Sequence, residues 1–362
     1  MPTCTMFSSP TTRPLPRPDQ LNMASRTLFV MPDATVAPLV AVVAAASKSI
    51  RVKMFVFTEP SLLDAVIAAK KRGVDVRVML NAARRSGESD NDESRKLLEA
   101  AGVTVKDANP EFDLTHEKSL VVDDTTAVIM SLNWETRNVT ETRDYAVVTD
   151  HRKEVTEVLT CFDADWDRTA FKPPEESHLI WCNANGRERF AHFIDRAQSE
   201  LWLQNERYQD AVIIERVVRA AGRGVKVNIL ARPPHTLKKD KLVEGVGGLR
   251  IMRDVGCKVH RMKGMKLHGK MMLADGNRAI IGSVNLAPGS FDARRELAIE
   301  VKDAAVIEPL QHVVRHDWEH SEPLDLTDAG LEADLKKRGG TDGSALVLDG
   351  SGNEGKKKSH KH

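Results

Sequence analysis

HGKMMLAD, at His268–Asp275, and GSVN, at Gly282–Asn285, form a pattern in which a histidine and a lysine two residues apart are followed by an aspartate, a serine and an asparagine. The chain carries this pattern twice, because HEKSLVVD and MSLN stand at His116–Asp123 and Met130–Asn133. The two copies lie about 150 residues apart, a period too long for a solenoid. The repeat predicts two equivalent halves that each contribute one histidine and one lysine to a shared site.

The segments around the two motifs repeat in the same order. Apolar and β-branched runs, typical of strands, alternate with stretches whose apolar residues have helical spacing. The strand-like runs are 28–30, 50–57, 74–80 and 103–105 in the first half, and 179–181, 200–204 and 225–230 in the second. The helical stretches include 36–46, 61–72, 188–197 and 211–223. This βαβαβ order predicts parallel strands with helical crossovers in each half.

The motifs resemble those of the phospholipase D superfamily, whose members include phospholipases D, cardiolipin and phosphatidylserine synthases and some endonucleases. The resemblance covers roughly residues 28–320, because the surrounding segments repeat along with the motifs. It implies an α/β fold of two pseudo-symmetric phospholipase D-like lobes, each a mostly parallel mixed sheet flanked by helices. The active site is then expected at the lobe interface.

Composition divides the chain into five expected parts. Proline, serine and threonine dominate the start, consecutive prolines at Pro173-Pro174 interrupt the middle, and glycine, serine and lysine dominate the end. Such segments do not form a packed core. The expected parts are a disordered leader at 1–25, lobe 1 at 26–172, a linker at 173–178, lobe 2 at 179–325 and a disordered, basic-ended tail at 339–362.

The paired histidines and lysines suit phosphodiester chemistry. Cleavage without a metal needs a nucleophile, positive charge for the non-bridging oxygens and an acid for the departing alkoxide. Imidazole can fill the first and third roles because its pKa lies near neutrality. If 114–122 and 266–273 are strands, a lysine two residues after a histidine shares its face. The predicted catalytic pairs are His116 with Lys118 and His268 with Lys270.

The second part of each motif supplies further polar groups. Ser131 and Asn133, like Ser283 and Asn285, lie two residues apart after an apolar run, so their hydroxyl and amide groups are predicted to bind the phosphate. Gly282 is expected to allow close approach of the backbone.

The aspartates of the motifs are expected to have a structural role. Asp123 and Asp275 stand five residues after their lysines, an odd number that places them on the opposite face of a continuous strand. We therefore expect each to serve in a turn or a salt bridge rather than in catalysis.

Two more acidic residues recur at equal spacing from the histidines. Asp144 and Glu296 each follow an arginine and precede an apolar strand. A carboxylate bound to the far nitrogen of an imidazole fixes its tautomer and orientation. The superfamily resemblance implies this role for an acidic residue here, and we expect Asp144 to pair with His116 and Glu296 with His268.

The resemblance also implies a two-step displacement through a covalent phosphohistidine, with neither a metal ion nor another cofactor. One histidine attacks phosphorus while the other protonates the departing alcohol, and water or another alcohol then reverses the process. We assign His116 as the nucleophile and His268 as the general acid, although the symmetry of the sequence leaves the reverse assignment open. Lys118 and Lys270 are expected to hold the phosphate.

The leading function is phospholipase D-type hydrolysis or exchange of phospholipid headgroups. The alternatives are a cardiolipin synthase-like phosphatidyltransferase, an endonuclease of the same superfamily and an inactive binding protein. A net charge of +1 and the lack of a long basic groove flanked by aromatic residues make nucleic acid the less favoured partner. Two intact motifs disfavour an inactive protein.

Composition also sets expectations for the cellular setting. The longest apolar run, 36–46, is shorter than the roughly 20 residues that span a bilayer. The four cysteines lack a CxxC pair and favour a reducing compartment. We therefore expect a cytoplasmic enzyme that meets phospholipid peripherally at a membrane surface. A monomer suffices for one site, and the sequence leaves the oligomeric state open.

Overall fold

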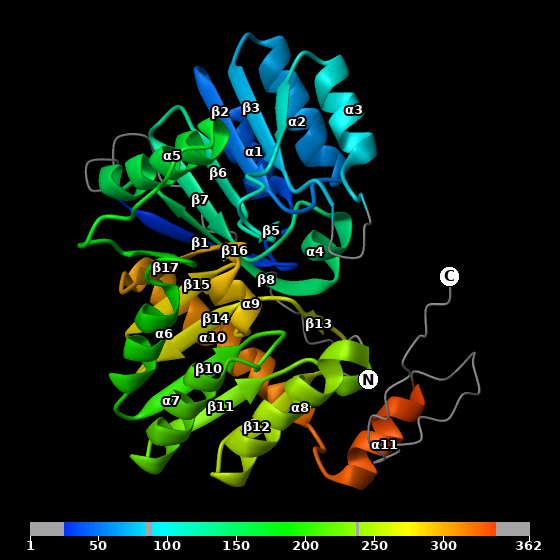
Figure 1. Ribbon diagram of the computed structural model, residues 1–362, viewed down its shortest axis with the longest axis vertical. Helices are drawn as coiled ribbons and strands as arrows, with labels where there is room; N and C mark the ends of the chain where they lie inside the picture. The colour runs from blue at the N-terminus through cyan, green and yellow to red at the C-terminus, as the bar shows by residue number, and fades with distance from the viewer. Residues whose placement is uncertain (1–24, 84–88, 237–238, 338–362) are drawn as a thin grey trace, which may run out of the picture.

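The computed structural model describes residues 25–83, 89–236 and 239–337. The expected leader, apart from Ser25, and the expected tail lie outside the described residues. Two lobes follow one another along the chain, the first at the top of Figure 1 in blue to green and the second below it in green to orange. Each lobe is a β-sheet flanked by helices, as the repeat predicted.

The first lobe contains thirteen named elements within the described residues. They are β1 (Arg26–Met31), α1 (Ala37–Ala44), β2 (Ser49–Met54), α2 (Pro60–Lys71), β3 (Asp75–Leu80), α3 (Asp92–Ala100), β4 (Thr104–Asp107), β5 (Leu114–Thr115), β6 (Ser119–Val122), β7 (Thr126–Met130), α4 (Thr136–Thr140), β8 (Thr142–Thr149) and α5 (Arg152–Asp167). The helices and strands expected before the first motif are present, and α5 joins this lobe to the second.

The second lobe repeats this order and extends it. Its elements are β9 (Leu179–Trp181), α6 (Gly186–Asp195), β10 (Glu200–Gln204), α7 (Ala211–Gly222), β11 (Lys226–Leu230), η2 (Pro234–Thr236), α8 (Lys239–Asp254), β12 (Lys258–Met262), β13 (Lys266–Leu267), β14 (Met271–Ala274), β15 (Arg278–Gly282), α9 (Pro288–Asp292), β16 (Arg294–Arg295), β17 (Leu297–Val301), α10 (Ala304–Glu319), β18 (Ser321–Pro323) and α11 (Asp328–Lys336).

Strand order confirms the internal duplication. The first sheet runs β1-β8-β7-β6-β2-β3-β4, and the second runs β9-β17-β15-β14-β10-β11-β12 with β18 added at its edge. Along these two orders the parallel pairs are confined to three successive strands, β2-β3-β4 and β10-β11-β12, and β13 adds a further parallel pair with β8. The other pairs along these two orders are antiparallel, so the sheets are mixed and their parallel part is smaller than the βαβαβ pattern indicated.

The helices between the parallel strands end where the sequence indicates. Both α2 and α7 stop just before a glycine with positive φ, Gly73 at 92° and Gly224 at 90°. Glycine adopts this left-handed conformation without the Cβ penalty that other residues have. The start of α7 is capped by Asp210, which accepts a hydrogen bond from the backbone N–H of Ile213. Each helix therefore returns the chain to the sheet at a defined point.

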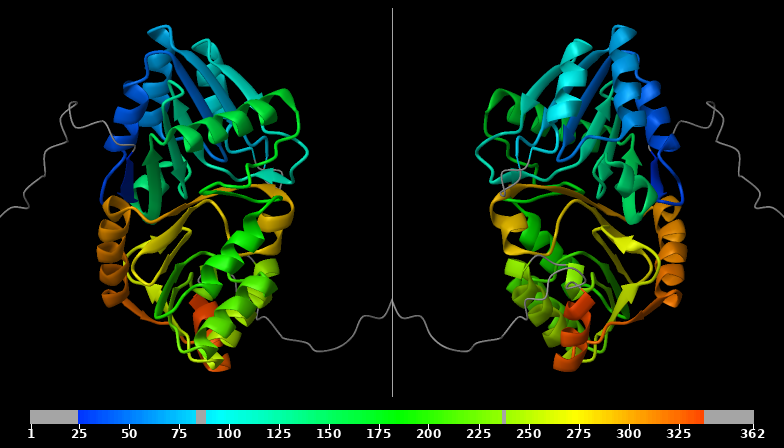
Figure 2. Two further views of the ribbon diagram at one scale, coloured as in Figure 1. Left: turned by 90° about the vertical axis from the view of Figure 1, so that its left-hand side faces the viewer. Right: turned by 90° about the vertical axis from the view of Figure 1, so that its right-hand side faces the viewer.

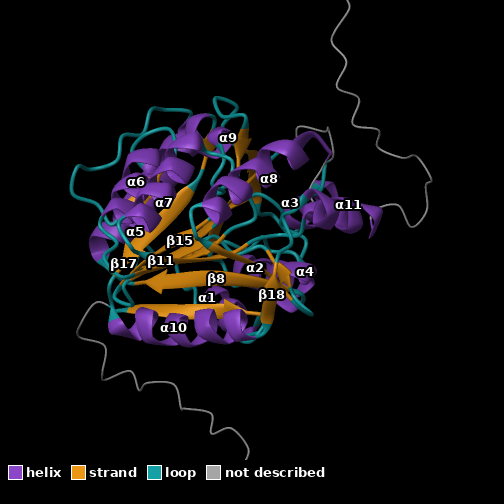
Figure 3. Cartoon of the chain, turned by 90° about the horizontal axis from the view of Figure 1, so that it is seen from below, coloured by secondary structure: helices purple, strands orange, loops and turns teal. Residues whose placement is uncertain are grey.

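A hydrophobic core lies between the lobes in addition to the core within each lobe. It joins side chains of the first sheet, such as Ile129 and Val147, to side chains of the second, such as Ile281 and Ile299. Each fully buried side chain of this kind contributes roughly 1.5–3 kcal/mol. Helix α10 of the second lobe also packs against β1 of the first, and it lies along the lower edge of the molecule in Figure 3. The lobes therefore form one packed unit.

Two short strands cross between the lobes. Strand β5 of the first lobe pairs with β16 of the second, and β13 of the second pairs with β8 of the first. Figure 2 shows the lobes meeting along this boundary. The expected continuous strands over 114–122 and 266–273 are wrong in this respect, because each is interrupted at the motif itself. Among the described residues, no helix is long and apolar enough to cross a bilayer.

Candidate active site

The two histidine–lysine motifs lie in the gaps between short strands at the lobe boundary. His116 and Lys118 stand between β5 and β6, and His268 and Lys270 stand between β13 and β14. The backbone N–H groups of His116 and Glu117 both donate to the carbonyl oxygen of Arg295, and each N···O distance is 2.9 Å. Each motif is therefore fixed against the other lobe, since the His268 and Gly269 N–H groups bind the carbonyl of Arg143 in the same way.

The carboxylates pair with the histidines crosswise. His116 Nδ1 lies 2.8 Å from Glu296 Oε2, and His268 Nδ1 lies 2.9 Å from Asp144 Oδ1. The expectation that each histidine pairs with the carboxylate of its own half is wrong. The physical reason is the strand exchange, because β5 beside β16 and β13 beside β8 bring each motif next to the carboxylate of the opposite lobe.

This arrangement gives both imidazoles the same working orientation. A carboxylate at Nδ1 fixes the tautomer and leaves Nε2 as the nitrogen that can react. Asp144 is itself held by the hydroxyls of Ser131 and Thr142, each 2.6 Å from one of its oxygens. Burial raises the pKa of Asp144, but His268, Lys270 and Ser131 together lower it below its usual value. The carboxylate stays charged at neutral pH.

His116 is the more deeply buried of the two imidazoles. Burial lowers its pKa to about 3, against the opposing effect of Glu296, and the ammonium of Lys118 adds to the lowering. Its ring also meets the Phe55 ring edge-on, with centroids 5.0 Å apart. At neutral pH the imidazole is therefore uncharged, the form that can act as a nucleophile.

The buried imidazole predicts a loss of stability in acid. The folded pKa of about 3 lies below the ordinary value of 6.5, so the unfolded chain binds more protons between these values and the free energy of unfolding falls as pH drops below 6.5. When the pH is lowered from 7 to 5, we expect the free energy of unfolding to fall by roughly 2 kcal/mol more for the native protein than for His116→Gln. Chemical denaturation at both pH values measures the difference. His312→Gln is the control, because His312 is exposed. An equal fall in the free energy of unfolding for the native protein and for His116→Gln would contradict the prediction.

The lysine of the first motif is buried beside its own histidine. Lys118 is fully buried and donates to the carbonyl of His116, and its ammonium lies 5.1 Å from the centroid of the Phe55 ring. Burial lowers the pKa of Lys118 well below its usual range, opposed by Glu296 and reinforced by Lys270. The charge of Lys270 thus acts on the first motif, which places both motifs in one electrostatic environment.

The asparagines and serines of the motifs have different roles. Asn133 and Asn285 are buried, and within the described chain neither side-chain oxygen has a hydrogen-bond partner. The Ser131 hydroxyl donates to Asp144, and the Ser283 hydroxyl contacts the backbone of Leu297. The prediction that the serines donate to the phosphate is therefore corrected, since their hydroxyls are engaged within the protein. The asparagines remain predicted phosphate ligands.

The aspartates of the motifs lie in turns, and the glycine lies at a close backbone contact. Asp123 has φ 52° and accepts hydrogen bonds from the N–H groups of residues 47–49, and Asp275 has φ 53° and does the same for residues 198–200. A Cβ on Gly282 would stand 2.3 Å from the carbonyl oxygen of Leu297. Each aspartate therefore ties the turn after its motif to the start of β2 or β10, and Gly282 admits the backbone of β17.

One site residue escaped the sequence analysis. Glu206 follows β10, and its Oε2 lies 3.0 Å from Lys270 Nζ and 3.7 Å from His268 Nε2. Its Oε1 accepts from Arg232 at 2.6 Å. A single glutamate after a strand carries no signal, and only alignment of the two halves shows that the first half has Phe55 at the equivalent place.

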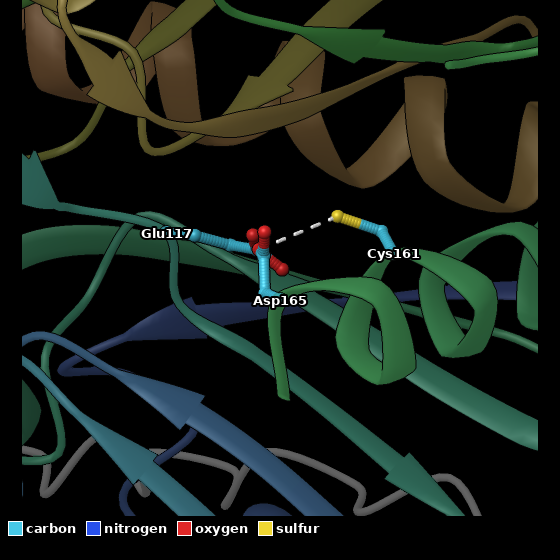
Figure 4. A group of neighbouring side chains, drawn as sticks. All are labelled: Glu117, Cys161 and Asp165. Atoms are coloured by element: carbon cyan, nitrogen blue, oxygen red, sulfur yellow. Dashed lines mark hydrogen bonds between the residues drawn. The ribbon is translucent and has the colours of Figure 1, made fainter. Parts of the chain in front are cut away.

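Beneath the first motif lies a cluster of potential metal ligands. Glu117, Cys161 and Asp165 offer ligand atoms within 4.8 Å of one another, and Figure 4 shows Cys161 and Asp165 rising from α5 toward Glu117. Lys53 Nζ lies 2.9 Å from Glu117 and 2.7 Å from Asp165, and Arg295 also binds Asp165 at 2.9 Å. These cations match the carboxylates, so we interpret the cluster as an ion-pair network that supports the motif.

The same network has a counterpart below the second motif. Arg143 forms two hydrogen bonds of 2.9 Å with Asp317 of α10, as Arg295 binds Asp165 of α5. Each arginine directly precedes a carboxylate of the active site. The two cross-lobe ion pairs therefore hold Asp144 and Glu296 in position from behind.

Comparison with known families gives a match over most of the chain. The family described as the phospholipase D-like domain of cardiolipin synthase matches residues 39–166 and 190–318, one copy for each lobe.

Curated relatives cover parts of the chain. The human mitochondrial cardiolipin hydrolase is 31% identical over 37% of this chain and 54% of its own length. Cardiolipin synthase B of Shigella flexneri is 25% identical over 66% of this chain and 66% of its own length. This chain thus spans between about half and two thirds of these relatives.

Solved structures share the two-lobed fold. Phosphatidylserine synthase of Haemophilus influenzae has a TM-score of 0.66 at 11% identity, covering 86% of this chain and 92% of that one. Polyphosphate kinase of Porphyromonas gingivalis has a TM-score of 0.67 at 17% identity, covering 88% of this chain and 52% of that one. At such low identity these similarities bear on the fold alone.

Proposed function

This chain belongs to the phospholipase D superfamily, in the family described as the phospholipase D-like domain of cardiolipin synthase, and on that premise we propose that it cleaves or exchanges phospholipid headgroups through a covalent phosphohistidine. The observation that carries the proposal is the crosswise pair of His–carboxylate contacts, which gives each lobe a reactive Nε2 beside its own lysine. The similarity to a cardiolipin hydrolase and to cardiolipin synthases supports phospholipid as the substrate class.

In the first step, Nε2 of His116 attacks phosphorus and the bond from phosphorus to the headgroup oxygen breaks. The oxygen takes a proton from Nε2 of His268 and leaves as an alcohol. The uncharged state of His116 supports its assignment as the nucleophile, because a protonated imidazole has no lone pair at Nε2. His268, with Asp144 at Nδ1 and Glu206 near Nε2, is the histidine that we assign as the general acid.

In the second step, the hydroxyl of water or of another alcohol gives its proton to His268 and bonds to phosphorus. The phosphorus–nitrogen bond breaks, and the electron pair returns to His116. Lys118 and Lys270 supply positive charge for the non-bridging oxygens throughout. We propose that these ammonium groups carry the role that a metal ion has in other phosphodiesterases.

A vesicle assay tests the function. Phospholipid vesicles with a labelled headgroup are incubated with the protein in the presence of EDTA, with and without ethanol. We expect release of the headgroup, formation of phosphatidylethanol when ethanol is present, and no inhibition by EDTA. Cleavage of single-stranded DNA without turnover of any lipid would replace the proposal with a nuclease, and inhibition by EDTA would overturn metal independence.

A further inference from the structure

The two halves of the active site differ at the position just before the bridges that join Phe57 to Trp134 and Tyr208 to Leu286. Asp123 and Asp275 bind the N–H groups of Ser49 and Glu200, so these two residues occupy the same place in β2 and β10. The bridges from Phe57 to Trp134 and from Tyr208 to Leu286 are likewise equivalent. Counting between these fixed points places Phe55 of the first lobe and Glu206 of the second at the same position.

The difference makes one side of the site apolar and the other anionic. On the first side, the Phe55 ring packs against both His116 and the ammonium of Lys118. On the second side, the carboxylate of Glu206 contacts Lys270 and lies 3.7 Å from the reactive nitrogen of His268. The pseudo-symmetric fold therefore encloses an asymmetric pair of surfaces around the phosphate position.

Glu206 is charged and can be reached by a ligand. Burial raises the pKa of Glu206, but Lys270, His268 and Arg232 together lower it well below its usual range. Its side chain is 12% exposed, whereas those of Asp144 and Glu296 are 0% exposed. Asp144 and Glu296 each bind the Nδ1 atom of a histidine and orient its ring. Glu206 binds neither Nδ1 atom.

A charged carboxylate opposes the binding of an anionic phosphodiester unless the ligand compensates it. Glu206 already binds Lys270 and Arg232, but Lys270 is also expected to hold the phosphate, so a hydrogen-bond donor or a cation on the ligand close to the phosphate would complete the partners of the carboxylate. The group next to His268 Nε2 is the departing alcohol in the first step and the incoming alcohol in the second. That alcohol is therefore the part of the ligand that Glu206 meets.

We propose that Glu206 is a specificity-determining residue that selects alcohols with a second hydrogen-bond donor, a neighbouring hydroxyl or ammonium group, beside the reacting hydroxyl. The proposal rests on the proposed function, since that function assigns the alcohol to the His268 side. In the second step the reacting hydroxyl gives its proton to His268 and bonds to phosphorus, while the neighbouring donor binds Glu206 and keeps its own proton. Alcohols that carry a carboxylate or a further phosphate at that place are disfavoured by charge repulsion.

A competition between matched acceptors tests this role. Vesicles containing phosphatidyl-p-nitrophenol are incubated with the native protein and equal concentrations of 1,2-propanediol and 1-propanol, and the two transfer products are quantified. Both alcohols compete for the same covalent intermediate, so the product ratio does not depend on the amount of folded enzyme. We expect the diol product to predominate, and in Glu206→Gln the ratio to fall about tenfold, because the amide oxygen of glutamine accepts a neutral hydrogen bond in place of a charge-assisted one.

Glu141→Gln is the control because the Glu141 side chain is half exposed and its carboxylate binds the ammonium of Lys266. We expect its product ratio to match that of the native protein. An unchanged ratio in Glu206→Gln overturns the inference and leaves the proposed function intact. Equal use of the two alcohols by the native protein also overturns it, even if the Glu206 variant fails to fold. Release of no p-nitrophenol by the native protein overturns the proposed function and the inference together.

Discussion

His116→Ala is expected to lower kcat by roughly 10⁴-fold or more, because it removes the nitrogen that forms the bond to phosphorus. The same variant should retain no labelled phosphate after incubation with vesicles of ³²P-labelled phosphatidyl-p-nitrophenol and quenching in alkaline SDS, because the phosphorus–nitrogen bond of a phosphohistidine is labile in acid. His268→Ala should behave differently with this substrate. p-Nitrophenolate leaves without a proton, so the covalent intermediate forms, and its slow reaction with water lets labelled phosphate accumulate on the protein.

The histidine variants decide between the two possible assignments. Circular dichroism is used before the labelling to check that both variants are folded. Accumulation of labelled phosphate on His116→Ala, with none on His268→Ala, would reverse the roles of the two histidines. Labelling of neither variant, while the native protein turns over the lipid, would contradict a phosphohistidine on either residue.

Glu296→Gln and Asp144→Asn are expected to lower turnover by about 10²–10⁴-fold, since loss of the carboxylate leaves an imidazole in the wrong tautomer. The crosswise contacts separate the two effects. Glu296 orients His116, so Glu296→Gln should slow release of p-nitrophenol as well as release of an ordinary headgroup. Asp144 orients His268, so Asp144→Asn should slow release of the ordinary headgroup but have little effect on the burst of p-nitrophenol.

This comparison tests the pairing itself. If each carboxylate served the histidine of its own half, the leaving group would rescue Glu296→Gln and not Asp144→Asn. Ser131→Ala serves as a milder companion, because it removes one of the hydrogen bonds to Asp144 and keeps the charge. We expect it to share the leaving-group dependence of Asp144→Asn with a smaller loss.

The sequence predicted the duplication and most of the elements because these depend on local pattern. Alternating apolar runs, helical spacing and the glycines at positions 73 and 224 act over a few residues, and the strands and helices appear where those signals lie. The identity of the histidine–lysine pairs was also available, since a repeated motif is visible without knowledge of the fold.

The pairing of carboxylates with histidines could not be predicted because it depends on which strands meet across the lobes. Asp144 and Glu296 recur at equal spacing from both histidines, so the sequence is compatible with pairing within a half or between halves. The two-residue strands β5, β13 and β16, which decide the matter, are too short to leave a periodic signal. Strand assignments across the motifs failed for the same reason.

The roles of the serines and of Glu206 depended on tertiary contacts. A hydroxyl can bind a ligand or the protein, and only the fold shows that Ser131 meets Asp144. Glu206 stood outside the motifs and became visible only through its position beside Lys270. Each half is best understood by its departures from the other half.

The exchange of β5 and β13 between the lobes means that the reaction centre exists only while the two halves stay docked. Parting the lobes would break both His–carboxylate contacts at once, even if each sheet remained intact. The rate of turnover therefore reports whether the two lobes are docked. The secondary-structure content does not report this, because each sheet can remain intact after the lobes part.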